Sequence, residues 1–252
     1  MSAGAPESSP LPPPPPVRAL VVGATGYVGR AVVAELRRKK LEVQAHVRFD
    51  SPRLEEMRAL FQKLGAECVT TAWNRDDFKE LAHQRGLTHV FLCLGTTFRR
   101  GKRKSTSSVP ETYAAVDVGL STLVIEACVQ SGLRPRVVLL SAARANPAAR
   151  NPYLAARGKV EALLQASGLD FTIAQPGFIT GSDREEFRPL ERIGAWMTDW
   201  FLLWGAVLGM QIMRERYRSI DARELAKALV THALDPLSAN RVLMGERLRD
   251  FP

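Results

Sequence analysis

Residues 19–22 read Ala-Leu-Val-Val, a short β-prone run, and the chain continues as Gly23-Ala24-Thr25-Gly26-Tyr27-Val28-Gly29. Helical spacing of apolar residues then extends from Gly26 to about Lys40. A glycine-rich turn between a strand and a helix is typical of a pyrophosphate site, because the backbone approaches the anion closely and the helix N–H groups point at it. A purely structural turn also uses glycine. The strand–turn–helix context favours the binding site.

The same alternation of strand and helix continues along the chain. We predict strands at 43–47, 67–71, 89–94, 136–140 and 170–175, and helices at 51–64, 76–84, 111–130 and 151–166. Ser51 and Pro52 are expected to cap and open the helix that Gly65 ends. A helix from 219–221 to about Ala233 and a strand at 240–244 are expected near the C-terminus. The pattern predicts a Rossmann-type α/β fold, a doubly wound parallel sheet with helices on both faces.

The composition is that of an ordinary globular protein. Of 252 residues, 46% are hydrophobic and 24% charged, which excludes a mostly disordered or collagen-like chain. The net charge of +9 favours anionic partners without choosing among them. Three widely spaced cysteines and four scattered histidines indicate neither a disulfide framework nor a metal site. We therefore expect a cytoplasmic, reducing setting.

The cofactor preference is predicted from the end of the second strand. NAD sites usually carry Asp or Glu about 20 residues after the glycine turn, to bind the ribose 2′-hydroxyl. Here Arg48 lies 19 residues past Gly29, and Arg53 follows shortly. A guanidinium suits a 2′-phosphate, which a carboxylate would repel. NADP(H) is therefore preferred over NAD(H), and Asp50 is interpreted as a loop residue or helix cap.

Several ordered motifs carry a family resemblance. They are GATGYVG at 23–29, CLGTT at 93–97, Val116-Asp117, LLS at 139–141, YLAARGKVE at 153–161 and FTIAQPGFITG at 171–181. With Arg48, this set resembles the atypical short-chain dehydrogenase/reductases, and within them the Tat-interacting-protein-like oxidoreductases. The resemblance implies that residues 95–97, at the end of the fourth strand, pass beside the cofactor. It also implies that residues 176–179 lie near the nicotinamide. The candidate cofactor residues are Gly23, Thr25, Gly26, Tyr27, Val28, Arg48, Arg53, Leu94, Gly95, Thr96, Thr97, Tyr153, Arg157, Pro176, Gly177, Phe178 and Ile179.

The resemblance also implies a catalytic set, from which this chain departs. The family uses a Tyr acid/base, a Lys four residues later that binds the ribose, and a Ser at the end of the fifth strand. Ser141 and Tyr153 match this pattern, but Arg157 stands where Lys is expected. Residues i and i+4 are helix neighbours, so Arg157 can face Tyr153 and supply a positive charge. Turnover could survive, weaken or be lost, and Asp117 is either a relay participant or a packing residue.

Several segments complete the predicted organisation. We predict that residues 1–17 form a disordered, Pro-rich tail without signal-peptide features, able to bind a proline-reading partner. Residues 18–252 form a single NAD(P)-binding domain, with a substrate-capping segment at about 180–218. The basic run 99–104 is interpreted as a solvated loop, a mobile lid or a contact for an anionic partner. Specific nucleic-acid recognition is disfavoured. The apolar run 195–213, with Trp196, Trp200 and Trp204 on one helix face, is a pocket wall, core, a homodimer surface or a peripheral membrane contact.

The sequence leaves three functions open. The first is an NADP(H)-dependent oxidoreductase acting on a carbonyl or alcohol substrate, with Tyr153 as acid/base, Ser141 as the carbonyl hydrogen-bond donor and Arg157 as ribose clamp. The alternative is an NADPH-binding regulatory or scaffold protein with little or no turnover. A membrane-surface or quinone-related redox role is a third, weaker hypothesis.

Overall fold

The computed structural model describes residues 16–95, 118–177, 179–180 and 220–250. Its centre is a parallel sheet of seven strands in the order β3-β2-β1-β4-β5-β6-β9. The reversal of strand order between β1 and β4 is the doubly wound arrangement that the sequence predicted. The strands are β1 (Arg18–Val22), β2 (Glu42–His46), β3 (Glu67–Val69), β4 (His89–Leu92), β5 (Arg136–Leu140), β6 (Phe171–Gln175) and β9 (Arg241–Met244).

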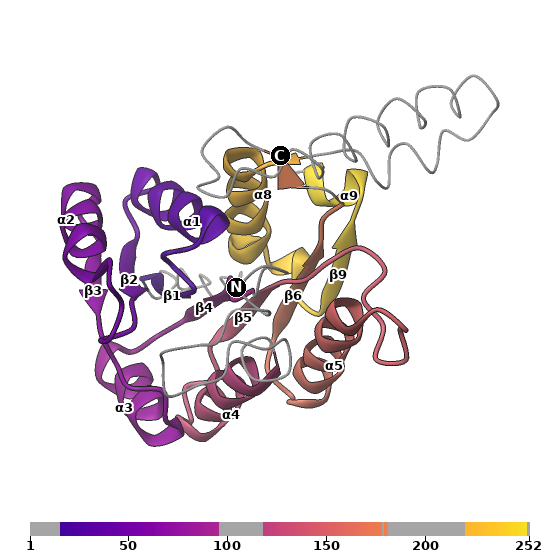
Figure 1. Ribbon diagram of the computed structural model, residues 1–252, viewed down its shortest axis with the longest axis horizontal. Helices are drawn as coiled ribbons and strands as arrows, with labels where there is room; N and C mark the ends of the chain where they lie inside the picture. Colours follow the sequence, from indigo (N-terminus) through magenta and orange to yellow (C-terminus); the bar gives the residue numbers. More distant parts are fainter. Residues whose placement is uncertain (1–15, 96–117, 178, 181–219, 251–252) are drawn as a thin grey trace, which may run out of the picture.

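Helices cover both faces of this sheet (Figure 1). On one face lie α1 (Tyr27–Arg38), α2 (Leu54–Leu64) and α8 (Ala222–Leu234), and on the other α3 (Arg75–Arg85), α4 (Ser121–Gln130) and α5 (Pro152–Ala166). Each face has its own apolar core because successive strand residues point to opposite sides. In β1, Val21 packs with the first group of helices, whereas Leu20 and Val22 pack with the second.

Local signals fix the helix ends. Gly65 and Gly86 end α2 and α3 in the left-handed conformation, with φ of 74° and 56°. Asn151 caps α5, its side-chain oxygen accepting from the N–H of Tyr153 at 2.9 Å. This cap fixes the start of the helix that carries two of the candidate site residues, Tyr153 and Arg157.

Some predicted boundaries were wrong. The helix expected from Ser51 begins at Leu54, because the chain first makes a turn in which the N–H of Ser51 donates to the carbonyl of Arg48. The third and fourth strands end two residues earlier than predicted. Sequence reasoning also missed short elements that carry little periodicity: β7 (Ile179–Thr180), β8 (Ile220–Asp221), η3 (Pro236–Ser238) and α9 (Glu246–Arg249).

Several predictions fall on residues outside the described ranges. They are the Pro-rich tail up to residue 15, the basic run 99–104, Asp117, the start of the helix predicted at 111–130 and the apolar run 195–213. The domain limits and the capping segment therefore stay predictions. Within the described ranges, no helix has the length and apolar character needed to cross a bilayer. The same residues contain no group of His, Cys, Asp and Glu that could hold a metal ion.

Candidate active site

The glycine turn lies where the carboxyl ends of β1 and β4 meet. Gly23 has φ of 83°, and a Cβ atom added there would lie 2.6 Å from the carbonyl oxygen of Cys93. A Cβ on Gly29 would lie 2.1 Å from the carbonyl oxygen of Gly23. Both approaches are closer than any side chain permits, so the turn requires glycine at these two positions. This tight packing brings the beginning of α1 up to the strand edge.

The first turn of α1 is suited to an anion. Its N-cap is Gly26, which has no side chain to accept hydrogen bonds from the first N–H groups of the helix. The first turn holds no acidic residue, and Arg30 donates to the carbonyl of Thr25 at 2.8 Å. Val28 is buried, so it can offer the ligand only its backbone. A helix N-terminus without a side-chain cap fits a pyrophosphate by charge and by hydrogen bonding.

The two arginines predicted to bind a 2′-phosphate differ in their contacts. Arg48 lies just beyond β2, half-buried, with its Nε atom 3.8 Å from a carboxylate oxygen of Asp50. Arg53 donates two hydrogen bonds to Glu56, at 2.8 and 2.7 Å. This bidentate pair is exposed to solvent, and the role of Arg53 toward the cofactor stays a prediction. Arg48, held by the longer and weaker contact, is the better candidate for the cofactor phosphate.

The end of β4 packs directly against α5. Leu94 and Gly95 lie within the described residues, whereas Thr96 and Thr97 do not. A Cβ on Gly95 would lie 2.6 Å from a terminal nitrogen of Arg157. The glycine therefore makes room for the arginine side chain at the edge of the sheet.

Arg157 is buried, with 3% of its surface exposed. Its guanidinium donates to the carbonyl of Leu140 at 3.0 Å and to the carbonyl of Leu94 at 2.7 Å, joining the ends of β5 and β4. It also lies over the ring of Tyr153, 5.4 Å from the ring centroid. These contacts differ from the ribose clamp that the sequence suggested, because two donors of the guanidinium bind backbone carbonyls.

Ser141 also has an internal partner. Its hydroxyl donates to the carboxylate of Glu161, which lies one turn beyond Arg157 on α5. The amide of Gln175, at the end of β6, donates to both oxygens of the same carboxylate at 3.0 Å. Burial raises the pKa of Glu161, while the hydrogen bonds from Ser141 and Gln175 and the charge of Arg157 act in the opposite direction. Residues 141, 157, 161 and 175 thus form one cluster beneath the sheet edge, which we call the carboxyl-edge cluster.

Sequence reasoning missed Glu161 and Gln175. A signal was present, since each is a polar residue at a core position: Glu161 follows Val160 on the inner face of α5, and Gln175 ends a buried strand. Pro176 and Gly177 continue from that strand, and the N–H of Ala143 donates to the carbonyl of Pro176 at 2.9 Å. Ile179 pairs with Ile220 in the β7–β8 ribbon, and Phe178 lies outside the described residues.

The thiol of Cys93, near Arg157, does not have the properties of a nucleophile. Burial raises the pKa of Cys93 to about 12, although the positive charge of Arg157 acts in the opposite direction. Burial likewise raises the pKa of Cys128 to about 12. Both thiols stay protonated near neutral pH, and reactive cysteines are thiolates.

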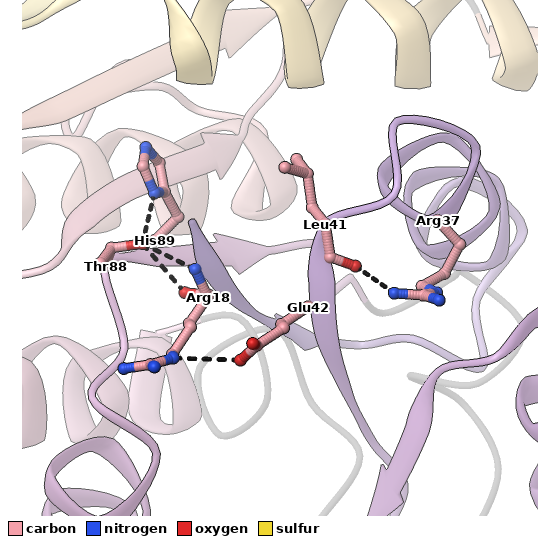
Figure 2. A network of polar contacts seen from close by, with 6 residues as sticks. All are labelled: Arg18, Arg37, Leu41, Glu42, Thr88 and His89. Atoms are coloured by element: carbon pink, nitrogen blue, oxygen red, sulfur yellow. Dashed lines mark hydrogen bonds and ion pairs between the residues drawn. The ribbon is translucent and has the colours of Figure 1, made fainter. Parts of the chain in front are cut away.

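A second polar region lies at the opposite edge of the sheet, where the strands begin. Figure 2 shows Arg18 directed toward Glu42, at 3.0 Å, while the N–H of Arg18 donates to the hydroxyl of Thr88 at 2.9 Å. A hollow of about 490 Å³ opens there, lined by Arg18, Glu42 and seven further residues. Ligands of doubly wound folds bind beyond the carboxyl ends of the strands, so this hollow is not the candidate site.

The fold and the glycine turn together define a dinucleotide-binding protein of the Rossmann type. The sequence model of the NAD(P)H-binding family matches residues 23–195, and the chain belongs to this family. It is a Rossmann-fold family related to the short-chain dehydrogenase/reductases, as the sequence predicted. The resemblance to the Tat-interacting-protein-like branch stays a prediction.

Two curated relatives match at the sequence level. One is the 4-hydroxy-2-methyl-3-oxo-4-farnesyl-3,4-dihydroquinoline-1-oxide ketoreductase of Stigmatella aurantiaca, 32% identical over 190 residues, covering 69% of this chain. The match spans about half of that relative, 53% of its length. The other is the uncharacterized sugar epimerase YhfK of Bacillus subtilis (strain 168), 26% identical over 167 residues, which cover 64% of this chain and 72% of the relative.

Solved structures show the same fold. The leucoanthocyanidin reductase of Vitis vinifera, solved as a binary complex with NADPH, has a TM-score of 0.63 and 14% identity, covering 90% of this chain and 67% of that one. The UDP-N-acetylglucosamine 4-epimerase of Bacillus cereus has a TM-score of 0.59 and 14% identity, covering 90% and 76%. At these identities the likeness concerns the fold alone.

Proposed function

We propose that the protein is an NADP(H)-dependent oxidoreductase of the atypical short-chain type, acting on a carbonyl or alcohol substrate. The observation that carries this proposal is the beginning of α1, which has no side-chain cap at Gly26 and which Gly23 and Gly29 allow to pack against the strand edge. Arg48 follows β2, the strand next to β1 in the sheet. Membership of the NAD(P)H-binding family supports the cofactor class, and the ketoreductase relative supports the substrate class.

Different residues at the carboxyl edge of the sheet would bind different parts of the cofactor. The N–H groups at the start of α1 would hold the pyrophosphate, and Arg48 the 2′-phosphate. Leu94 and Gly95, followed by residues 96 and 97, would lie along the middle of the cofactor, and residues 176–179 near its nicotinamide. When bound, the nicotinamide exchanges a hydride with the substrate carbon. The phenol of Tyr153 would donate a proton to the substrate oxygen in reduction and accept it in oxidation.

Arg157 supports this arrangement from below. Its guanidinium fixes the carbonyls of Leu94 and Leu140, and hence the ends of the two strands between which the substrate would lie. The same group places a permanent positive charge against the ring of Tyr153, which holds the two side chains together. In this assignment Arg157 is a positioning residue, and ribose binding is left to backbone groups and to Tyr153.

A second candidate function is cofactor binding with little turnover. It is favoured by the contacts of Ser141 and Arg157, since the hydroxyl binds Glu161 and two guanidinium donors bind backbone carbonyls. Arg157→Lys separates the two candidates. An enzyme gains or keeps NADPH oxidation with a panel of aromatic ketones, whereas a binding protein turns over none of them in either form.

The first experiment is calorimetric titration of the full chain with NADPH and NADH. We expect NADPH to bind more tightly than NADH. Arg48→Ala should lower the affinity for NADPH by about tenfold to a hundredfold and change the affinity for NADH little. Arg58→Ala is the matched control, because this exposed arginine on α2 contacts Glu55, at 2.6 Å, and Cys68 of β3, and neither is a candidate cofactor residue. Binding of neither nucleotide would overturn both candidate functions.

A further inference from the structure

We propose that Glu161 is a positioning residue that decides whether the hydroxyl of Ser141 can donate a hydrogen bond to a substrate oxygen. This inference rests on the proposed oxidoreductase function and adds a residue that the sequence did not single out. It comes from the carboxyl-edge cluster. There the buried carboxylate of Glu161 accepts the hydrogen bond that Ser141 would have to donate to a substrate oxygen.

The geometry leaves the serine one use of its proton. A hydroxyl has one O–H donor and two acceptor lone pairs. The hydroxyl of Ser141 donates to Glu161, and Ser141 and Glu161 are 3% and 8% exposed, so solvent does not compete for this bond. While the carboxylate is ionised, Ser141 can accept a hydrogen bond but cannot donate one elsewhere. A substrate carbonyl needs a donor.

A proton on Glu161 reverses this polarity. The protonated carboxyl can donate to the oxygen of Ser141, and the serine proton is then available for a substrate oxygen. The proton comes from solvent and remains on Glu161, so nothing is oxidised, reduced or transferred in the reaction itself. Within the described residues, Glu161 faces the hydroxyl of Ser141 from β5, the amide of Gln175 from β6 and the charge of Arg157 on its own helix.

The rest of the cluster keeps this carboxyl in place. Gln175 donates to both carboxylate oxygens, which fixes the plane of the group, and the helix places Arg157 one turn away. Burial raises the pKa of Glu161, which moves its protonation toward the range in which enzymes work. A buried carboxyl held by two neutral donors suits a group that changes its protonation state in place.

The first test measures the hydrogen bond without requiring turnover. In the full chain labelled with ¹³C-glutamate, the Glu161 carboxyl signal is identified by its loss in Glu161→Gln and followed against pH. We expect Ser141→Ala to shift its midpoint to higher pH, because the carboxylate loses a donor. Gln175→Leu should shift the midpoint in the same direction. The test can therefore still be made if one of the two variants does not fold. Ser167→Ala, whose hydroxyl donates to Leu164 at the end of the same helix, should leave it unmoved.

The second test measures reduction of 9,10-phenanthrenequinone by NADPH as a function of pH. We expect Ser141→Ala to lower kcat by about tenfold below the Glu161 midpoint and by progressively less above it. In Glu161→Gln this pH dependence of kcat should disappear. The KM for NADPH should change by less than about twofold, because Glu161 does not touch the cofactor in this proposal.

The outcomes separate this inference from the proposed function. A midpoint unmoved by Ser141→Ala and by Gln175→Leu, or an equal loss of kcat at every pH, would overturn the role of Glu161. Wild-type protein that binds NADPH but reduces no carbonyl compound would overturn the proposed function, and with it the step from Ser141 to a substrate. The shift of the carboxyl midpoint would still report whether the Ser141–Glu161 bond exists.

Discussion

Charged side chains serve different purposes at the two edges of the sheet. At the amino edge, Arg18 and Glu42 form an ion pair whose side chains are 40% and 60% exposed. At the carboxyl edge, Arg157 and Glu161 are buried and bind backbone carbonyls, a hydroxyl and an amide. Exposed pairs contribute little because water solvates their partners equally well, whereas a buried charge loses its only partners when they are removed. The edge that would bind the cofactor is therefore also the edge least tolerant of substitution.

The largest expected effect is at Arg157. Arg157→Met leaves the carbonyls of Leu94 and Leu140 buried without their donors, and we expect a loss of about 3–5 kcal/mol in the free energy of unfolding. Urea denaturation followed by circular dichroism measures it. Lys159→Met, on the exposed face two residues later, should change stability by less than about 0.5 kcal/mol. Equal losses for the two variants would mean that the contrast between buried and exposed charges fails.

The next effect is expected at the glycine turn. Gly29→Ala places a Cβ atom against the carbonyl oxygen of Gly23, which moves α1 away from the strand edge and should cost about 1–3 kcal/mol. NADPH binding should fall by about a hundredfold or more, because the N–H groups move with the helix. Gly132→Ala is the control: it also adds a Cβ atom to a glycine, but in open space. Gly132 has φ of 74°, so the control includes a backbone strain that Gly29→Ala does not. An unaltered NADPH affinity in Gly29→Ala would remove the turn from the binding site.

A smaller effect follows from a buried histidine at the carboxyl end of β2. His46 lies against the rings of Trp73 and Phe78, its Nε2 atom is 2.8 Å from the carbonyl of Thr71, and burial lowers its pKa. The unfolded chain then takes up a proton near pH 6.5 before the folded chain does, so stability is complete above that pH and declines as the pH falls toward the lowered value. Thermal unfolding between pH 7.5 and 5 measures the decline. It should be weaker in His46→Phe, and unchanged in His83→Gln on the exposed face of α3.

The smallest effect is expected at the amino edge. A double-mutant cycle with Arg18→Ala and Glu42→Ala should give a coupling energy below about 1 kcal/mol, decreasing further in 0.5 M salt. Urea denaturation of the four proteins measures it, and none of them should change NADPH affinity. A coupling energy comparable to the loss in Arg157→Met would show that the two edges do not differ.

The fold could be predicted from the sequence because its signals are local. Apolar runs of four or five residues predicted the main strands, and Gly65, Asn151 and Asp221 mark helix ends that the structure confirms. The start of α2 was placed wrongly because Ser51 and Pro52 also fit a turn, and the turn forms. The two-residue strand β7 and the single-turn helix α9 are too short to show a period, and no apolar run marks them.

The candidate site was predictable only in part. Sequence spacing showed that Arg157 and Tyr153 share one face of a helix, but not whether the guanidinium turns toward a ligand or into the sheet. That choice depends on Gly95, 62 residues earlier, which leaves room for it. Glu161 and Gln175 were missed because their pairing joins a helix to a strand, and a lone polar residue in an apolar segment does not identify its partner.

The packing of α8 against α1 has a consequence for synthesis of the chain. Leu36 of α1 and Leu225 of α8 belong to one apolar core, although roughly 190 residues separate them along the sequence. At a translation rate of about 5–20 residues per second, α1 waits on the order of 10–40 s for the helix that covers it. During that interval its apolar side is open to chaperones and to other nascent chains. The yield of folded protein should therefore depend on how quickly α8 leaves the ribosome.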